Sequence, residues 1–232
     1  MFFGLATLWW LCVLGLPAAL MLMCLPQKWR TPLGRRLIAF GFTLYLLFLR
    51  VFCCVRLNHS ALDTLKNERS LIIVANHPSL LDAVILLSKL PHATCVMKAS
   101  LRKNWLFASM SRLSGYITNE DPMRLVKQAC AELENGGQLL IFPEGTRTLE
   151  DVINPFSQMT AMIAVRAQTD IQAVFIHFST SYLGKRDSLF QKPTLPLHID
   201  LQLGQRFPCA VTSIGLTERL ESYYREHLKK SS

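Results

Sequence analysis

Residues 71–90 read LIIVANHPSLLDAVILLSKL, and this stretch decides the fold class. Its first five residues, Leu71–Ala75, are a short continuous apolar run, which is typical of a strand buried on both faces of a parallel sheet. A helix is expected to follow from about residue 80 to residue 90. A buried strand that leads into a helix indicates an alternating α/β domain.

The alternation continues along the rest of the chain. Further strands are predicted at residues 138–142, 171–178 and 197–203, and further helices at residues 121–135, 158–167 and 216–229. The helix at 121–135 has the best-defined ends, because Asp121 is an N-cap candidate, Pro122 takes the first helical position and a Gly-Gly pair follows. We therefore predict a single α/β domain over residues 57–232, with a mostly parallel sheet flanked by helices.

Residues 1–56 carry most of the excess apolar content of the chain. Residues 2–25 contain no charge, and at ~1.5 Å per residue they would reach about 36 Å, enough to cross a hydrocarbon core. A secretory signal peptide is the alternative, but the basic segment that should begin one is absent. We therefore predict that residues 1–56 form N-terminal membrane-anchoring helices, including a transmembrane helix.

The second apolar stretch, residues 37–55, is interrupted by Arg50 and follows a basic segment that the positive-inside rule places in the cytoplasm. A second span would export the rest of the chain, so we expect a tilted or interfacial helix with Arg50 and Arg56 at headgroup level. The seven cysteines form no C-x-x-C pair and favour reduced thiols. The expected location is the bacterial inner membrane, with the globular domain on its cytoplasmic face.

The charge of the chain restricts its partners. A net charge of +9 and a pI near 9.4 indicate an acidic partner. The sequence has no zinc-finger spacing, RNP-like aromatic motif or basic recognition helix, so nucleic acid is the weakest candidate. An anionic membrane face, together with a phosphate-bearing substrate or carrier, fits the apolar N-terminus better.

The first motif, N-H-P-S-L-L-D at residues 76–82, lies where the predicted strand meets its helix. Catalytic groups of open α/β sheets gather at the carboxyl ends of strands, and His77 there can take a proton from a hydroxyl near neutral pH. Asp82 can orient this imidazole only if His77 lies before the helix begins, which Pro78 favours. Ser79-x-x-Asp82 is also a capping-box-like pattern, and capping alone would explain the carboxylate.

The second motif, F-P-E-G-T-R at residues 142–147, follows the strand predicted at 138–142. Gly145 allows the backbone to approach a ligand closely, and Arg147 offers a planar fork for phosphate or carboxylate. Glu144 could accept a hydrogen bond from an acceptor hydroxyl. Taken alone, the motif could equally be a tight turn with a surface salt bridge.

The two motifs together, in this order and each after a strand, resemble the pattern of the glycerol-phosphate and lysophospholipid acyltransferase family. The resemblance covers roughly residues 57–207. It implies a ternary-complex acyl transfer in which His77 is the general base and Asp82 orients it. The acceptor site that it implies contains Glu144, Gly145, Thr146 and Arg147. The sequence has no G-x-S-x-G elbow, and neither motif contains a cysteine. No covalent acyl-enzyme is therefore expected.

The sequence departs from the family pattern at two places, one that bears on the acceptor and one that bears on the start of a strand. The acidic-basic pair of the middle motif is replaced by Thr118-Asn119, which argues against glycerol-3-phosphate as the acceptor, and the strand at residues 171–174 lacks its flanking prolines, which should affect only the start of that strand. The middle motif also contains a basic-aromatic stretch with two interpretations, a solvated helix end or a surface for headgroups or an acyl carrier protein. Its basic residues are Lys98, Arg102 and Lys103.

The resemblance implies a membrane-associated O-acyltransferase of lipid biosynthesis and phospholipid metabolism. The acyl chain would pass from acyl-CoA or acyl carrier protein to a hydroxyl of a lysophospholipid-like acceptor, so the thioester donor is a co-substrate and no bound cofactor or metal is expected. The alternatives are a non-catalytic lipid-binding or scaffold protein with the same fold, a lipid hydrolase that uses water, and an acyltransferase for a non-glycerophosphate lipid such as an aryl-polyene or lyso-amino lipid.

Overall fold

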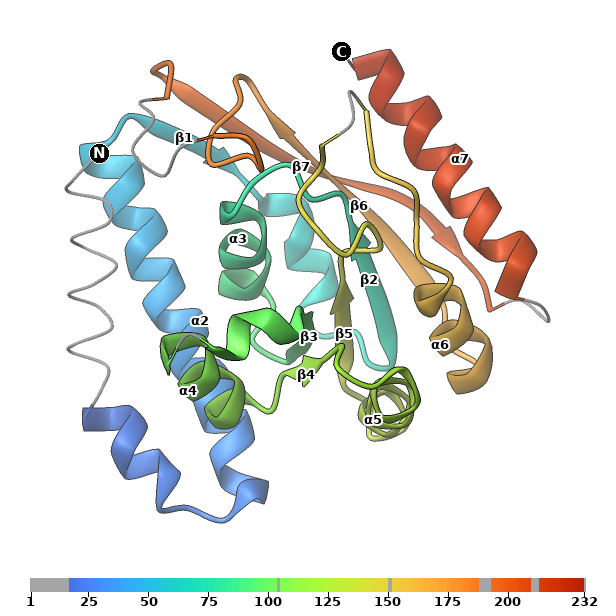
Figure 1. The fold of residues 1–232 in the computed structure, drawn as a ribbon. Helices are drawn as coiled ribbons and strands as arrows, with labels where there is room; N and C mark the ends of the chain where they lie inside the picture. Colours follow the sequence, from blue (N-terminus) through green and yellow to red (C-terminus); the bar gives the residue numbers. More distant parts are fainter. Residues whose placement is uncertain (1–16, 104, 150–151, 188–192, 210–212, 232) are drawn as a thin grey trace.

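The computed structural model describes residues 17–103, 105–149, 152–187, 193–209 and 213–231. A single seven-stranded sheet lies between two layers of helices (Figure 1). The strands are β1 (Val55–Asn58), β2 (Leu71–Ala75), β3 (Ala93–Met97), β4 (Ile117–Thr118), β5 (Gln138–Ile141), β6 (Ile171–Phe178) and β7 (Leu197–Phe207). The helices are α2 (Gln27–Phe52), α3 (Leu81–Lys89), α4 (Trp105–Ser114), α5 (Pro122–Glu134), α6 (Met159–Ala167) and α7 (Ser213–Ser231), with 3-10 helices η1 (Ser60–Leu65) and η2 (Ala99–Lys103).

The order of the strands in the sheet is β1-β7-β6-β2-β5-β3-β4. All neighbouring strands pair in parallel except β6 and β7, which are antiparallel. The predicted α/β fold with a mostly parallel sheet is therefore confirmed. Because β1 and β7 run against the other five strands, the amino ends of these two lie at the same end of the sheet as the carboxyl end of β2.

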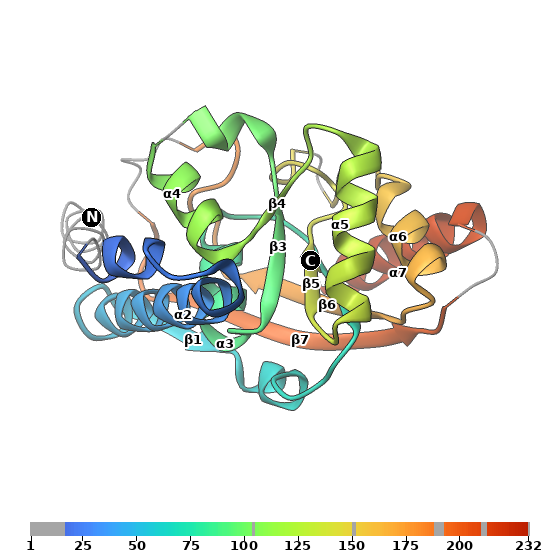
Figure 2. The same ribbon diagram turned by 90° about the horizontal axis from the view of Figure 1, so that it is seen from below.

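Strand β2 occupies the middle of the sheet, and each of its residues is buried. Leu71, Ile73 and Ala75 belong to the core cluster on one face of the sheet, which α2 and α3 cover. Ile72 and Val74 belong to the cluster on the other face, under α5, α6 and α7 (Figure 2). A strand with an apolar layer on both faces needs an apolar residue at every position, which is why its sequence does not alternate.

Helix α2 contains the second apolar stretch, and its composition corrects the prediction of membrane helices. Within the described ranges, no helix is both long and apolar enough to cross a membrane, so the predicted transmembrane helix is wrong there. Most of the first apolar stretch, residues 2–16, lies outside the described residues. Although α2 has 26 residues, it includes the basic segment of residues 28–36 and buries Tyr45, Leu46 and Leu49 against the domain. The division of the chain at residue 56 stays a prediction.

A buried arginine attaches α2 to the rest of the fold. Arg35 donates through Nη1 and Nη2 to the carboxylate of Glu132 on α5, at 2.6 and 3.1 Å. Its Nε donates to the carbonyl of Ser114 at 2.8 Å, and Nη1 also donates to the carbonyl of His92 at 3.2 Å. The preceding residue, Gly34, lies so close to α4 that a Cβ there would fall 2.4 Å from a backbone oxygen. Helix α2 is thus joined by specific contacts to elements on both sides of the sheet.

We expect Arg35→Ala to lower the free energy of unfolding by about 3 kcal/mol, because it leaves a partly buried carboxylate and two carbonyls without their donor. Denaturant unfolding of the full chain measures this change. Arg36→Ala is the matched control, since the neighbouring Arg36 is exposed and its loss should cost less than about 0.5 kcal/mol. Equal stability of the two variants would show that the Arg35 contacts contribute nothing.

Candidate active site

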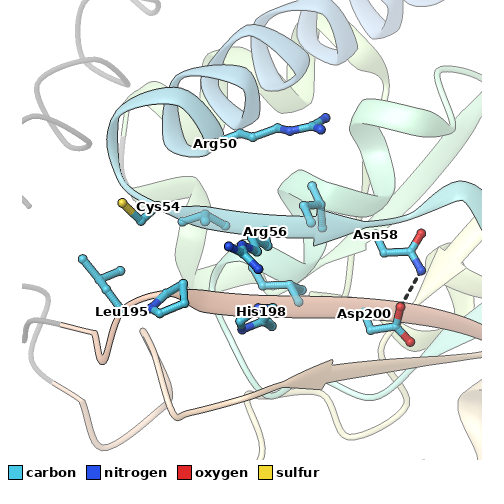
Figure 3. A pocket seen from close by; sticks show the side chains of 11 residues that line it. Arg50, Cys54, Arg56, Asn58, Leu195, His198 and Asp200 are labelled. Atoms are coloured by element: carbon cyan, nitrogen blue, oxygen red, sulfur yellow. Dashed lines mark hydrogen bonds between the residues drawn. The ribbon is translucent and has the colours of Figure 1, made fainter.

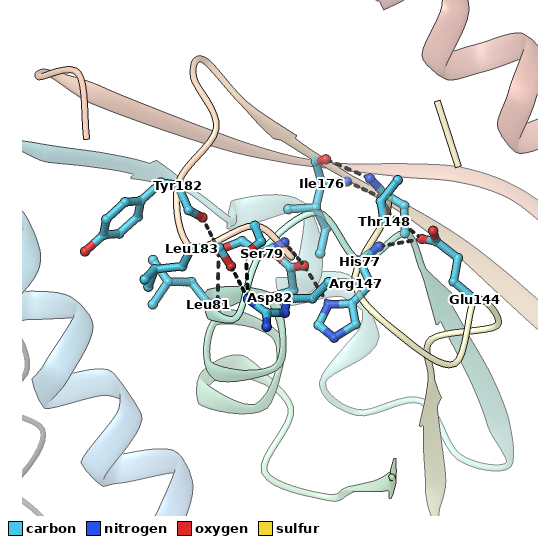
Figure 4. A network of polar contacts seen from close by, with 12 residues as sticks. His77, Ser79, Leu81, Asp82, Glu144, Arg147, Thr148, Ile176, Tyr182 and Leu183 are labelled. Carbon is cyan, nitrogen blue, oxygen red and sulfur yellow. Dashed lines mark hydrogen bonds and ion pairs between the residues drawn. The ribbon is translucent and has the colours of Figure 1, made fainter. Parts of the chain in front are cut away.

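The N-H-P-S segment begins at the carboxyl end of β2 and is tied to the neighbouring strand β6 (Figure 4). Asn76 is buried, and its side chain pairs with the backbone of Ile176 in β6. Its Nδ2 donates to the Ile176 carbonyl at 2.9 Å, and its Oδ1 accepts from the Ile176 N–H at 2.8 Å. This amide continues the hydrogen bonding of the sheet by one residue and fixes the backbone that carries His77.

His77 and Asp82 meet because the helix begins only after the histidine. Helix α3 starts at Leu81, and the His77 Nδ1 lies 2.9 Å from the Asp82 Oδ2. An ionised carboxylate only accepts, so it places the imidazole proton on Nδ1 and leaves the lone pair on Nε2. The ring stacks on Phe142 with the centroids 4.1 Å apart and 22° between the planes. These contacts fix the orientation of the His77 ring, and Nε2 is the nitrogen that does not face Asp82.

Asp82 makes the contacts that the capping interpretation and the orienting interpretation each require. Asp82 is fully buried, and its Oδ2 also accepts from the Ser79 N–H at 2.8 Å. The Ser79 hydroxyl accepts from the Leu81 N–H at 3.2 Å and donates to the Tyr182 carbonyl at 2.7 Å. One carboxylate oxygen thus holds the turn before α3 and the imidazole in a fixed relation.

Glu144 joins the second motif to the first. Its side chain is buried, and Oε1 accepts from the backbone N–H of His77 at 2.9 Å and from the Thr148 hydroxyl at 3.0 Å. Its Oε2 accepts from the N–H of Asn154 at 2.9 Å. The Thr148 N–H in turn donates to the His77 carbonyl at 2.8 Å. The sequence predicts Glu144 at the acceptor, whereas in the structure its hydrogen bonds join it to the loop that carries His77.

Arg147 holds the loop that follows β6. Its Nη1 donates to the carbonyls of Leu183 and Gly184 at 2.8 and 2.7 Å, in the same loop whose Tyr182 carbonyl accepts from Ser79. No described residue forms a hydrogen bond or ion pair with its Nε or Nη2. The arginine is half-buried beside Thr148, which contacts the His77 backbone. One edge of the guanidinium therefore binds the loop that follows β6.

The remaining predicted site residues have weaker links to His77. Gly145 is exposed with a φ of +65°, a left-handed conformation that glycine adopts without strain, and Thr146 is half-buried beside it. Lys98 and Lys103 are exposed on the segment after β3, and the side chain of Arg102 lies outside the described part. In the described ranges, no hydrogen bond or ion pair joins the two lysines to His77.

Several residues of this network carry no sequence pattern that could have revealed them. Asn154 and the backbone carbonyls of residues 182–184 come from irregular loops, and a backbone carbonyl has no side-chain identity to recognise. Asn119, at the place of the missing charged pair, accepts from the N–H of Ala99 at 2.8 Å.

Among the residues that the structure describes, no three His, Cys, Asp or Glu side chains gather as a metal site.

Burial shifts the ionisation of both carboxylates in this network. It raises the pKa of Asp82 from 3.8 to about 6, although the hydrogen bond and charge of His77 and the Ser79 N–H oppose the shift. Burial also raises the pKa of Glu144, against the hydrogen bonds from Asn154, His77 and Thr148. Asp82 therefore titrates within the pH range in which the imidazole must work.

We expect kcat/KM to rise with pH through about 6, because only ionised Asp82 keeps the proton on His77 Nδ1. The pKa of Asp82 is higher in the folded state than in the unfolded chain. Its contribution to stability is therefore complete below about pH 4 and is lost as the pH rises to about 6. Over that window the melting temperature of Asp82→Asn should rise relative to that of the parent. A rate that does not change between about pH 5 and pH 7 would contradict this assignment.

A family model described as Acyltransferase matches residues 56–177, the part of the chain that runs from β1 to β6 and contains both motifs. The chain belongs to this acyltransferase family. His77, Asp82 and the F-P-E-G-T-R motif all lie within the matched residues.

Two relatives and one solved structure resemble this acyltransferase-family chain. A protein of Mycoplasma pneumoniae named as a 1-acyl-sn-glycerol-3-phosphate acyltransferase is 29% identical over 135 residues, which cover 53% of this chain and 50% of the relative. A Caenorhabditis elegans protein named for the same activity is 28% identical over 134 residues, or 53% of this chain and 46% of the relative. The chain thus spans about half the length of the curated relatives that it matches.

The structural likeness extends further along the chain than the sequence likeness. The crystal structure of the 1-acyl-sn-glycerophosphate (LPA) acyltransferase PlsC from Thermotoga maritima matches with a TM-score of 0.71, at 18% identity. The match covers 99% of this chain and 95% of the PlsC chain. At this identity the likeness establishes a shared fold.

Proposed function

We propose that this acyltransferase-family chain moves a fatty acyl group from a thioester donor, acyl-CoA or acyl carrier protein, to the free hydroxyl of a 1-acylglycerol-3-phosphate-like lysolipid. The observation that carries the proposal is the His77–Asp82 pair, whose geometry leaves the imidazole Nε2 free as a base at the carboxyl end of β2. The names of the two curated relatives support the choice of acceptor.

The residues support direct transfer without an acyl-enzyme. His77 Nε2 takes the proton of the acceptor hydroxyl while its oxygen attacks the thioester carbonyl, and the proton then goes to the leaving thiolate as the C–S bond breaks. Asp82 stabilises the imidazolium that forms between these steps. The Ser79 hydroxyl is engaged with Leu81 and Tyr182, so it serves the helix start.

The test is a thiol-release assay with acyl-CoA and acyl carrier protein as donors, each combined with lysophosphatidic acid, a zwitterionic lysolipid or glycerol-3-phosphate. We expect thiol release that requires lysophosphatidic acid, with the diacyl product found by mass spectrometry. Free fatty acid without an acylated product would identify a hydrolase. A folded chain that releases no thiol with any acceptor would favour the lipid-binding or scaffold alternative.

We expect Arg147→Ala to raise the KM for the lysolipid acceptor about 10- to 100-fold, and the KM for the donor much less, because a charge-assisted pair is worth about 1.5–3 kcal/mol. Arg147 also donates to two loop carbonyls, so its variants need a melting control. Arg147→Lys keeps the charge without the fork and should recover only part of the affinity. Equal increases in both Michaelis constants would show that Arg147 acts only through the loop.

We further propose that the chain works with α2 resting on a lipid surface. The observation that favours this is a row of exposed apolar side chains along one side of α2, spaced three or four residues apart. The row consists of Phe40, Leu44, Leu47 and Val51. Flotation of the full chain with liposomes tests the proposal, and Leu47→Asp should weaken binding while the melting temperature is unchanged. Unaltered flotation of that variant would exclude this face.

A further inference from the structure

A cleft of about 890 Å³ lies at the edge of the sheet, away from the His77 network (Figure 3). Its walls come from all four residues of β1, from the first part of β7 with the Leu195–Pro196 segment before it, and from the end of α2. Two strands, β7 and β6, separate β1 from the strand that leads to His77. The cleft is therefore distinct from the candidate active site.

Two arginines line this cleft. Arg50 extends from the last turn of α2 and Arg56 from β1, and both are exposed. Across the described ranges, no acidic side chain forms a salt bridge with either. The guanidinium groups thus retain the planar forks that bind phosphate oxygens in pairs.

The one acidic residue that lines the cleft is already engaged by amides. Asp200 lies on β7, and its Oδ1 accepts from the Asn58 Nδ2 at 2.7 Å. Its Oδ2 accepts from the Gln202 Nε2 at 2.8 Å. Among the described residues, Asp200 forms no ion pair with either arginine, so the lining carries two cationic side chains against one carboxylate.

Leu195, on the wall opposite α2, gives the cleft an exposed apolar side chain, and it is 52% exposed. Next to the cleft, Val51 and Phe52 directly follow Arg50 in the last turn of α2 and are 62% and 70% exposed. Apolar side chains that project beside cationic ones fit an interface between acyl chains and headgroups. The same side chains would be unfavourable around a site for a fully soluble anion.

We infer that this cleft binds the phosphate of an anionic phospholipid headgroup, with Arg50 and Arg56 as the donors. The inference rests on the proposed work at a lipid surface and adds a specific contact to it. The headgroup phosphate enters between the two guanidinium groups, and Val51, Phe52 and Leu195 lie against the adjoining acyl chains. A lipid held there would fix the orientation of the domain on the surface, with the active-site end of the sheet toward the membrane.

The test measures binding of the full chain to vesicles of phosphatidylcholine alone and of phosphatidylcholine with about one-third phosphatidylglycerol. We expect Arg50→Gln/Arg56→Gln to lower the partition onto the anionic vesicles about tenfold or more and to leave the zwitterionic binding unchanged. The matched control is Arg124→Gln/Lys127→Gln, which removes two exposed charges from α5 on the other face of the sheet. It should change the partition less than about threefold.

A charge-conserving variant separates a phosphate site from a general field. Arg50→Lys/Arg56→Lys keeps both charges but removes the forks, and we expect it to lose most of the anionic binding. If it binds as the parent does, the cleft is not a site and the inference fails. If millimolar inorganic phosphate or CoA displaces the parent from vesicles, the cleft takes soluble phosphates and the lipid assignment fails.

The result does not depend on turnover. Acyl transfer to a lysolipid dispersed in detergent should be the same for Arg50→Gln/Arg56→Gln and the parent, since neither arginine belongs to the His77 network. If the double variant loses binding to anionic vesicles and the parent has no transferase activity, the cleft is upheld and the proposed function is rejected. If the double variant binds vesicles as the parent does and the parent is an active transferase, the cleft is rejected and the proposed function is upheld.

Discussion

Replacement of His77 by alanine is expected to lower kcat/KM for acyl transfer by about 10²–10⁴-fold, the usual contribution of a general base. His77 is held by three contacts: the Asp82 carboxylate at Nδ1, the Phe142 ring against the imidazole, and Glu144 at the backbone N–H. Alanine keeps the backbone contact to Glu144 but removes the base, the ring contact and the donor to buried Asp82, so the rate is compared at a temperature at which both proteins are folded.

The measurement is the rate of thiol release together with thermal melting of parent and variant. His92→Ala is the matched control, because the His92 side chain is exposed and the fold uses only its carbonyl, which accepts from Arg35. The control should retain the parental rate. A folded His77→Ala protein with near-parental turnover would reject the mechanism and return the scaffold alternative.

The parts of the fold that could be predicted are those with a local cause. The continuous run of β2 follows from apolar layers on both faces, and the boundaries of α5 follow from the Asp121 cap, whose Oδ1 accepts from the N–H groups of Met123 and Arg124. The strands β1, β3 and β4 and the helix α4 were not predicted. Strand β4 is only two residues long and exists through its pairing with β3.

The candidate site shows the same division. The residue types at His77, Asp82, Glu144 and Arg147 could be recognised in the sequence, but their bonds could not. In the sequence, the carboxylate of Glu144 could bind an acceptor hydroxyl as well as a backbone N–H group. Only the folded chain brings it to the N–H groups of His77 and Asn154. Likewise, the basic segment of α2 was interpreted as flanking a membrane span, whereas Arg35 within it pairs with Glu132, which is 97 residues away in the sequence.

Asp82→Asn is expected to cost activity far more than stability, with kcat lowered by about 10²–10⁴-fold. In the parent, Asp82 Oδ2 accepts from both the Ser79 N–H and the His77 Nδ1–H. An amide oxygen in the place of Oδ2 can still accept from Ser79 and from the His77 Nδ1–H. The amide is neutral, however, and cannot stabilise the imidazolium that forms when Nε2 takes a proton, so the base is weakened while the turn before α3 is kept.

The pattern of losses separates orientation from capping. Ser79→Ala is the contrasting variant: it removes the hydroxyl that accepts from Leu81 and should cost about 1 kcal/mol of stability, while the His77–Asp82 pair remains. Asp82→Asn should do the opposite and should also abolish the rise in rate near pH 6, because the amide does not titrate. If Asp82→Asn matched the parent in rate and pH profile, Asp82 would be only a cap. If its rate fell only in proportion to its folded fraction, the loss would be structural. The combination of a low rate, an intact melting transition and a vanished pH step requires that the buried carboxylate acts through His77.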